Sequence, residues 1–161
     1  MQRTKAPLAF LLAQVGAHAS MRFGERISHL NLTPPDAGIL RMLGVSGGLS
    51  QQELATRLGI HASRLVAILD ALEERRLVER RPNSDDRRQY ALHLTEEGQG
   101  TLNEIGGIGR EHTESLCASL TAAEREQLGE LLQKIATEQG LSPGVHPGYQ
   151  RMRPGTKEAK A

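Results

Sequence analysis

The chain has 161 residues, which is enough for one domain with a buried core, and no apolar run approaches the length of a membrane span. Its formal net charge of +1 excludes a uniformly basic surface, and the absence of tryptophan argues against a stacking platform for single-stranded bases. The single cysteine, Cys117, excludes an internal disulfide and a zinc knuckle built from several cysteines of one chain.

The first predicted element is a long amphipathic helix. Residues 1–6 are expected to form a flexible N-terminus, and apolar residues recur at helical spacing from Leu8 to Leu30. Two basic residues precede an apolar run at 7–15, as in a signal peptide, but the run is short and continues into the periodic helix without a cleavage site. The sequence therefore favours a mature helix and a cytoplasmic protein.

Cap residues mark the next two helices. Residues 33–36, Thr-Pro-Pro-Asp, combine a threonine cap, prolines in the first turn and an acid three residues after the cap. This second helix is expected to end near Gly44. Ser50 and Glu53 form a capping box that opens a third helix, and Gly59 ends it.

A fourth helix and a hairpin complete the central stretch, residues 50–95. The helix begins near His61 or Ala62, and its apolar residues follow the spacing of one inward face. Two strand-like runs at 77–81 and 88–94 flank a charged turn. Helix, turn, helix and hairpin in this order are typical of a winged helix-turn-helix, which makes double-stranded DNA the expected partner.

Threonine caps open two more helices after the hairpin. Thr95 begins a fifth helix that reaches to about residue 119, and a capping box at Thr121 begins a sixth helix that Gly140 ends. Residues 141–161 are rich in proline and glycine and are expected to form a flexible basic tail. The predicted fold is mainly α, with six helices, a small β-hairpin wing and a helical dimerisation region formed by the N- and C-terminal helices.

The predicted fifth helix is unusually rich in glycine, and each interior glycine costs up to about 1 kcal/mol relative to alanine. One interpretation is a bend or a close helix contact at the dimer interface, and the other is a hinge that changes the spacing of two DNA-binding lobes. We favour the first. The glycines are Gly98, Gly100, Gly106, Gly107 and Gly109.

The outward face of the fourth helix is small in its N-terminal half. Arg64 is the one long donor there and can bind the guanine edge with two hydrogen bonds, while small apolar neighbours can contact a thymine methyl. A solvated face of an ordinary amphipathic helix is the alternative, and the neighbouring helix and hairpin favour DNA. The expected major-groove residues are His61, Ala62, Ser63, Arg64, Val66 and Ala67.

The hairpin carries a local excess of arginine, with six arginines and three acids between residues 75 and 88. An arginine on a wing suits the narrow, electronegative minor groove of A·T-rich DNA. Asp86 and Arg88 are close enough in sequence to pair across the turn. We expect Asp86, Arg87 and Arg88 to form the minor-groove contact, and Arg80 to contact phosphate.

The run DRRQYALHLT, from Asp86 to Thr95, resembles the wing signature of the MarR family of bacterial transcription regulators: Asp, any residue, Arg, five residues of any kind, then Leu-Thr. Residues 58–81 are similar to that family's recognition helix and first wing strand. The resemblance implies that Asp86 positions Arg88 in the minor groove and that residues 61–67 read the major groove. It also implies phosphate contacts from three further residues, Ser50, Gln51 and Arg57.

The same resemblance implies an overall organisation. Residues 7–140 would form one MarR-type domain, with a DNA-binding lobe at 50–95 and dimerisation helices at 7–32 and 96–140. The implied function is a homodimeric, ligand-responsive repressor on a pseudo-palindromic operator. A winged-helix module for protein contact, without an operator, is the alternative, and a metal-dependent enzyme is a third.

Four positions depart from the family pattern. His61 stands where a serine or aspartate cap is usual, and Arg76 stands where glycine is usual, so a left-handed Arg76 would cost roughly 1 kcal/mol. Ala67 and Ala71 replace residues that are often arginine. Base readout therefore depends on Arg64, and binding depends strongly on the wing.

The resemblance also implies a small aromatic or acidic ligand, in a crevice between the first, second and fifth helices. His18, Arg22 and Phe23 are the residues expected to line it, and core packing or surface exposure is the equal alternative for them. The histidines have no pair at the i, i+4 spacing of a helical metal site. A zinc site from His18, His29 and His112 with Glu25 or Glu111 is the weaker alternative. We predict no bound metal and no cofactor. We also predict no catalytic residue and no enzyme activity, because no candidate nucleophile has a general base placed beside it in the sequence pattern.

Overall fold

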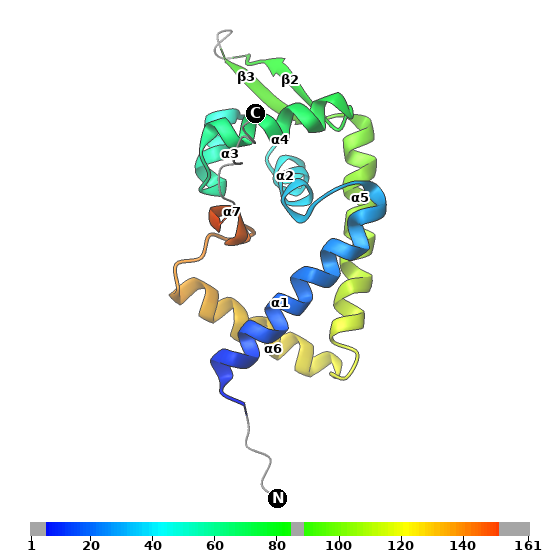
Figure 1. The fold of residues 1–161 in the computed structure, drawn as a ribbon, viewed down its shortest axis with the longest axis vertical. Helices are drawn as coiled ribbons and strands as arrows, with labels where there is room; N and C mark the ends of the chain where they lie inside the picture. The colour runs from blue at the N-terminus through cyan, green and yellow to red at the C-terminus, as the bar shows by residue number, and fades with distance from the viewer. Residues whose placement is uncertain (1–5, 85–88, 152–161) are drawn as a thin grey trace, which may run out of the picture.

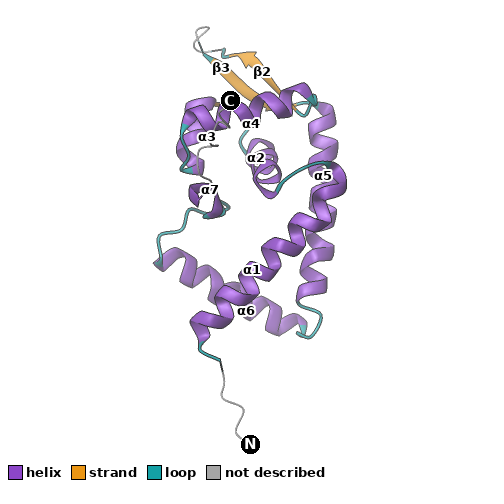
Figure 2. Ribbon diagram, in the orientation of Figure 1, coloured by secondary structure: helices purple, strands orange, loops and turns teal. Residues whose placement is uncertain are grey.

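The computed structural model describes residues 6–84 and 89–151. The long helices α1 and α5 lie against each other, with a small sheet at one end of the molecule and α6, which overlaps α1 in this view, at the other (Figure 1). Helices dominate, and the only strands in the described residues lie beside α3 and α4 (Figure 2). In chain order the elements are α1 (Leu8–Ile27), η1 (Ser28–Leu30), α2 (Pro34–Val45), β1 (Leu49–Ser50), α3 (Gln51–Leu58), α4 (Ala62–Glu74), β2 (Val78–Pro82), β3 (Tyr90–Leu94), α5 (Glu96–Leu116), α6 (Ala122–Glu138) and α7 (Gly148–Arg151).

The predicted helix starts are confirmed because local cap chemistry sets them. Thr33, Ser50 and Thr121 each accept a hydrogen bond from the backbone N–H three residues later. The acid at that later position binds the cap backbone in return, which satisfies two of the N–H groups that a helix start leaves free. All six predicted helices are present, with the 3-10 turn η1 and the short helix α7 in addition.

The hydrophobic core lies in the half of the molecule that holds the sheet. The apolar faces of α2, α3 and α4 meet there, with fully buried side chains such as Leu40, Leu54 and Leu69. At the opposite end, α6 has no buried residue and α1 has only Ile27. One end of the molecule therefore has a packed hydrophobic core, and the helices at the other end leave their apolar side chains uncovered.

The wing is a three-stranded antiparallel sheet in the order β1-β3-β2, one strand more than predicted. The extra strand, β1, pairs Leu49 with Leu92 and Ser50 with Ala91. The sequence does not predict β1, because a strand of two residues is too short to show an alternation of apolar and polar side chains. Its pairing with β3 attaches the start of α3 to the wing.

The end of α4 confirms the expected strain. Arg76 has a φ of 57°, in the left-handed region, and its N–H bonds the Glu73 carbonyl 2.9 Å away. This conformation costs about 1–2 kcal/mol for a residue with a Cβ. It turns the chain so that β2 can begin two residues later.

One of the α5 glycines has a clear packing reason within the chain. A Cβ on Gly98 would lie 1.9 Å from the Leu77 carbonyl oxygen, so only glycine allows α5 to start this close to the wing. Gly100 and Gly109 have open space where a Cβ would stand. This close contact is with the same chain, so the interpretation of a bend or a close helix contact at the dimer interface stays a prediction.

The C-terminal segment corrects the predicted flexible tail over its described part, residues 141–151, which we call the C-terminal strap. The Tyr149 side chain is buried, and its hydroxyl donates to the Pro35 carbonyl oxygen at 2.5 Å. Arg41 donates to the Gly144 carbonyl oxygen at 2.9 Å. A single buried aromatic residue in a segment rich in proline and glycine gives no periodic pattern, which is why the sequence did not indicate this packing.

Within the described ranges, no helix has the length and apolar character that crossing a membrane requires.

Candidate nucleic-acid interface

The two helices of the predicted DNA-binding lobe, α3 and α4, are joined by a tight turn. Gly59, with a φ of 66°, ends α3, and its N–H bonds the carbonyls of the last turn. His61 then occupies the N-cap of α4 without a side-chain capping bond, as the sequence indicated. Leu65 and Leu69 are fully buried below the turn, which fixes the outward face of α4.

None of the predicted major-groove residues is buried. His61, Ser63 and Ala67 are exposed, and the other three are half-buried at the edges of the same face: Ala62, Arg64 and Val66. No side chain of the described residues hydrogen-bonds or ion-pairs with the Arg64 guanidinium. The face is therefore narrow, small and equipped with one available long donor, which suits insertion into a groove.

Arg80, the predicted phosphate contact, forms ion pairs within the chain. It lies on β2 and donates from Nη2 to Asp70 Oδ1 at 2.7 Å and from Nη1 to Glu73 Oε2. Burial acts to lower the pKa of Arg80, but the hydrogen bonds and charges of the two carboxylates outweigh it and raise the pKa. Because both terminal nitrogens hold carboxylates, the side chain is better suited to neutralising the acids of α4 than to binding phosphate.

The described part of the wing ends at the base of its tip. Pro82 pairs with Tyr90, and the Asn83 N–H donates to the Gln89 carbonyl at 2.8 Å. Asp86, Arg87 and Arg88, the predicted minor-groove residues, lie outside the described residues. The strands that carry them stand at the end of the molecule beyond α4 (Figure 1).

The three phosphate candidates implied by the resemblance lie at two ends of α3. Ser50 and Gln51 stand at its start, where the Ser50 hydroxyl accepts from the Glu53 N–H at 3.2 Å. The Ser50 N–H bonds the Glu53 carboxylate in return, and this contact lowers the pKa of Glu53. Arg57 is a helix length away, exposed, and donates to Ser46 Oγ at 3.3 Å.

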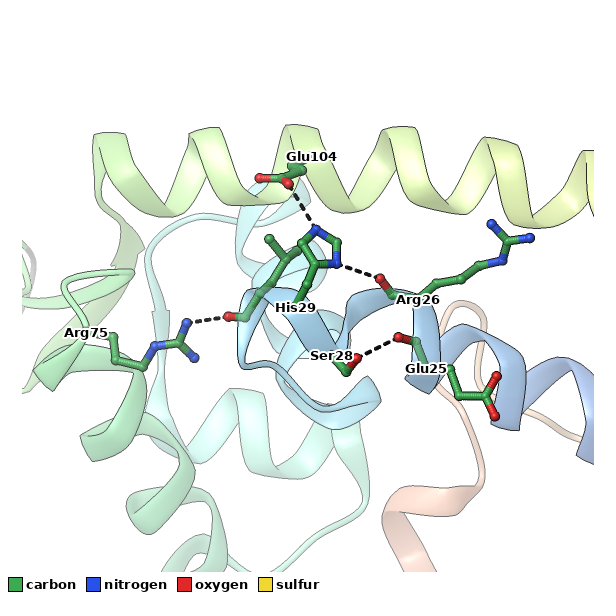
Figure 3. Close-up of polar contacts among 7 residues, drawn as sticks. Glu25, Arg26, Ser28, His29, Arg75 and Glu104 are labelled. Carbon is green, nitrogen blue, oxygen red and sulfur yellow. Dashed lines mark hydrogen bonds and ion pairs between the residues drawn. The ribbon is translucent and has the colours of Figure 1, made fainter.

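A polar joint links the lobe to the long helices (Figure 3). Arg75, just after α4, donates to the backbone carbonyls of Asn31 and Leu30 at 2.6 and 2.7 Å. His29, in the same η1 turn, contacts the Arg26 carbonyl at 2.9 Å and Glu104 of α5 at 3.3 Å. The turn between α1 and α2 is thereby held both by Arg75, at the end of α4, and by α5, which links residues far apart in the sequence.

The predicted ligand residues are divided between two pockets. His18 and Arg22 line one of about 450 Å³ between α1 and α5, together with Arg26 and His112. Phe23 lines another of about 500 Å³, between α1, α2 and the C-terminal strap. His18 and Arg22 are four residues apart on one face of α1, whereas the next residue projects about 100° further around the helix.

The pocket between α1 and α5 is strongly basic. Burial lowers the pKa of His112, and the nearby positive charges of Arg26, Arg22 and His18 lower it further, against a hydrogen bond to the Ala19 backbone. The Arg26 Nε atom is buried without a hydrogen-bond partner in the described structure. These features suit an anion. The described residues contain no group of three or more histidine, cysteine or acidic side chains that could hold a metal ion.

Comparison with known proteins identifies the family. A sequence model of the MarR family matches residues 30–89. A putative transcriptional regulatory protein for the hcr operon of Thauera aromatica is 32% identical over 137 residues, covering 84% of this chain and 82% of its own length. The chain belongs to the MarR family.

Two solved MarR-type structures are similar over nearly their whole length. The Mycobacterium tuberculosis MarR family protein Rv2887, in complex with DNA, is 30% identical with a TM-score of 0.71, covering 81% of this chain and 98% of that one. The transcriptional repressor CouR, bound to a 23-mer DNA duplex, is 33% identical with a TM-score of 0.71, covering 81% and 92%. The winged helix-turn-helix fold is thereby confirmed.

Within this MarR-type fold, the sequence did not mark Arg26, Arg75 and Tyr149 as residues that shape the candidate sites, and it marked His112 only as a member of the alternative zinc site. The arginines act across elements, on groups far away in sequence, so no local pattern marked them. Tyr149 is one of only two tyrosines in the chain, but Leu141 and Val145 are the other large apolar residues of its segment, and no periodic pattern separated the buried side chain from the exposed ones.

Proposed function

We propose that this chain is a DNA-binding transcription regulator that acts as a homodimeric repressor on a pseudo-palindromic duplex site. The observation that carries the proposal is the exposed, narrow face of α4 with the available Arg64, next to a wing. Its support from relatives is direct, since two structures at 30% and 33% identity hold DNA.

In this proposal α4 enters the major groove with its N-terminal half. Arg64 binds a guanine edge, and the small residues around it allow the backbone to approach the bases. The acids of the C-terminal half, Asp70 and Glu73, are partly neutralised by Arg80, so they repel phosphate less. The Asp86–Arg88 wing tip contributes the minor-groove contact, and Ser50, Gln51 and Arg57 approach the phosphates.

Fluorescence anisotropy with labelled duplexes from the chain's own upstream region tests DNA binding. We expect affinity to fall steeply with salt, and the salt slope to weaken by about one unit in Arg88→Ala. Arg64→Ala should lose roughly 1–3 kcal/mol on the preferred site and little on unrelated duplexes. Arg110→Ala, an exposed arginine on α5, is the matched control.

The alternative is a winged-helix module for protein contact. It gains if wild-type protein shows no salt-dependent binding to any upstream duplex, or if Arg64→Ala and Arg88→Ala bind as wild type does.

The homodimer is supported by the apolar side chains at the open end of the molecule. Phe10 and Val15 of α1 are more than half exposed, and so is Leu131 of α6. Leu128, Leu132 and Ile135 extend this surface along α6. A second copy with the same surface is the natural cover for it, because a two-fold interface is self-complementary.

The ligand that relieves repression is proposed to be a small aromatic acid in the basic pocket between α1 and α5. Its carboxylate would bind the free Arg26 Nε, next to the ring of His112, which lies 5.7 Å from that of Phe23. An anion there offsets the mutual repulsion of four basic side chains from two helices. Ligand binding at this junction can then change how α1 and α5 hold the DNA-binding lobe.

A further inference from the structure

The helix α6 is held to its own chain mainly at its two ends. It buries none of its residues, and no other element of the described chain packs extensively against it. At its start, Arg125 donates from Nε to the carbonyl oxygens of Cys117 and Leu120 at 3.0 and 3.2 Å, which holds the turn from α5. At its end, Gly140, with a φ of 67°, turns the chain into the C-terminal strap. The position of α6 relative to the DNA-binding lobe therefore depends on what the strap contacts.

The strap returns from α6 toward the DNA-binding lobe, as its orange-to-red trace shows, and attaches there to α2 (Figure 1). Tyr149, on the short helix α7, is 5% exposed and belongs to the hydrophobic core cluster. Its hydroxyl donates to the Pro35 carbonyl oxygen at 2.5 Å, and Arg41 donates to the Gly144 carbonyl oxygen at 2.9 Å. Because α2 also packs against α5, the elements α5, α6, strap and α2 form a closed frame. A closed frame resists the change of angle that a single hinge between α5 and α6 would allow.

The surface of α2 is matched to the Tyr149 side chain. A Cβ on Gly38, inside α2, would overlap the Tyr149 hydroxyl oxygen and would lie 3.2 Å from the ring carbon that carries it. Glycine within a helix is destabilising relative to alanine. Gly38 therefore gives up some helix stability and provides the room that the hydroxyl group occupies, so the sequence of α2 accommodates the attachment of the strap.

The rest of the strap is held weakly. Residues 141–144, 146 and 147 are all exposed, and Val145 is half-buried. His146 contacts Ser20 at 3.4 Å, the long limit for a hydrogen bond. Segments with few buried contacts open at low free-energy cost, so loss of the Tyr149 ring should detach the whole strap from α2.

We propose that the C-terminal strap is a brace that fixes the angle between α6 and the DNA-binding lobe, and that Tyr149 is its anchor. In the homodimer, α6 belongs to the interface, so the brace of each subunit sets the separation of the two lobes. The dimer then accepts one spacing of DNA half-sites. This consequence for DNA rests on the proposed function, whereas the brace itself is a property of the single chain.

Spin-label distances within one chain test the brace without any reliance on DNA binding. Labels at Glu74→Cys on α4 and Glu130→Cys on α6, both exposed positions, report the separation of the lobe from α6 in a Cys117→Ser background. Dilution with excess unlabelled protein leaves only the distance within a chain. The intact strap should give a narrow distance distribution, and Tyr149→Ala should give a clearly broader one. An equally narrow distribution in Tyr149→Ala would overturn the proposal.

Gly38→Ala is the matched variant, because it displaces the anchor without altering the strap and adds a better helix former to α2. Its methyl group overlaps the phenol oxygen, so the distance distribution should broaden as it does in Tyr149→Ala. Gly38→Ala/Tyr149→Phe removes that oxygen and leaves the nearest ring carbon 3.2 Å from the new Cβ, so it should restore most of the narrow distribution. A double variant as broad as Gly38→Ala would show an effect on α2 itself and would overturn the assignment of Tyr149 as the anchor.

Half-site spacing gives the functional readout. Anisotropy titrations compare a palindromic duplex with the same duplex carrying one additional central base pair. The wild type should bind one of the two several-fold more tightly, and Tyr149→Ala should lose most of that preference while its affinity for a single half-site stays unchanged. Equal preference in both proteins, with broadened distances in Tyr149→Ala, would overturn the role of the brace in spacing. A wild type that binds neither duplex would overturn the proposed function and leave the spin-label result intact.

Discussion

At the scale of single residues, the contacts of Arg80 change what the fourth helix offers to DNA. Asp70 and Glu73 stand on the half of α4 that follows the proposed reading face, where a free carboxylate would repel phosphate. Arg80 binds both of them from the first wing strand. The side chain that looked like a phosphate ligand in the sequence is thus placed to remove a repulsion.

A mutant cycle on the labelled duplex separates these two roles of Arg80. Arg80→Gln should weaken binding by about 1 kcal/mol, roughly fivefold, because it leaves two carboxylates uncompensated at a partly exposed site. In an Asp70→Asn/Glu73→Gln background the same change should have little effect, since the repulsion is already gone. A direct phosphate contact predicts the opposite, an equal loss in both backgrounds, and anisotropy titrations at fixed salt distinguish the outcomes.

Residue-level features were predictable where their cause is local. The three capping boxes, the missing cap at His61 and the left-handed Arg76 all follow from neighbours within a few positions, and all are confirmed. The pairing of Arg80 with Asp70 spans ten positions and two elements. No local sequence pattern predicts that β2 packs beside the C-terminal half of α4.

At the scale of elements, α1 is shared by two pockets of different chemistry. Its His18–Arg22 face turns toward α5 and forms the basic pocket, and its Phe23 side faces α2 and the strap. The sequence predicts one crevice for all three residues, because they lie within six positions of one another along the same helix. Helical geometry separates adjacent residues by about 100°, and here that rotation divides an anion site from an apolar one.

The basic pocket should link ligand binding to pH through His112. Its pKa is held below 6.5 by burial and by the positive charges around it, so the folded state favours neutral His112. The unfolded chain binds this proton more readily, so His112 contributes stability above pH 6.5 that is lost as pH falls through the lower folded pKa. A bound carboxylate should reverse the shift by favouring the imidazolium.

Histidine NMR titration and calorimetry check this on the full chain. Saturating benzoate should raise the pKa of His112, and benzoate affinity should therefore increase as pH falls from about 7.5 to about 5.5. His112→Gln should bind with far less pH dependence, and benzamide, the neutral analogue, should show none. If benzoate leaves the His112 titration curve where it was, the carboxylate does not occupy this pocket.

At the scale of the whole molecule, the chain is a packed lobe attached to helices with an uncovered apolar surface. The core cluster joins α2, α3, α4 and the sheet, whereas α6 buries none of its residues within the chain. The sequence predicts the amphipathic pattern of α6. It does not predict what covers the apolar face, because periodicity does not distinguish packing within the chain from packing against another chain.

The uncovered apolar surface of α1 and α6 predicts that a single substitution there can prevent formation of the homodimer. Leu131 of α6 is 53% exposed in the single chain, and in the proposed homodimer it would be covered by the partner. Leu131→Glu places a carboxylate in that interface twice, once for each subunit, at roughly 2–3 kcal/mol each. Light scattering after size-exclusion chromatography should give a dimer for the wild type and a monomer of unchanged helix content for the variant.

Val45→Glu is the matched control, because Val45 is 83% exposed at the end of α2, next to the DNA-binding lobe and away from α6. It should remain dimeric. The monomeric Leu131→Glu should also bind a full palindromic duplex no better than a half-site, since two lobes no longer bind together. A Leu131→Glu protein that stays dimeric would place the interface elsewhere, and a monomeric wild type that still binds the palindrome cooperatively would mean that DNA itself brings the two lobes together.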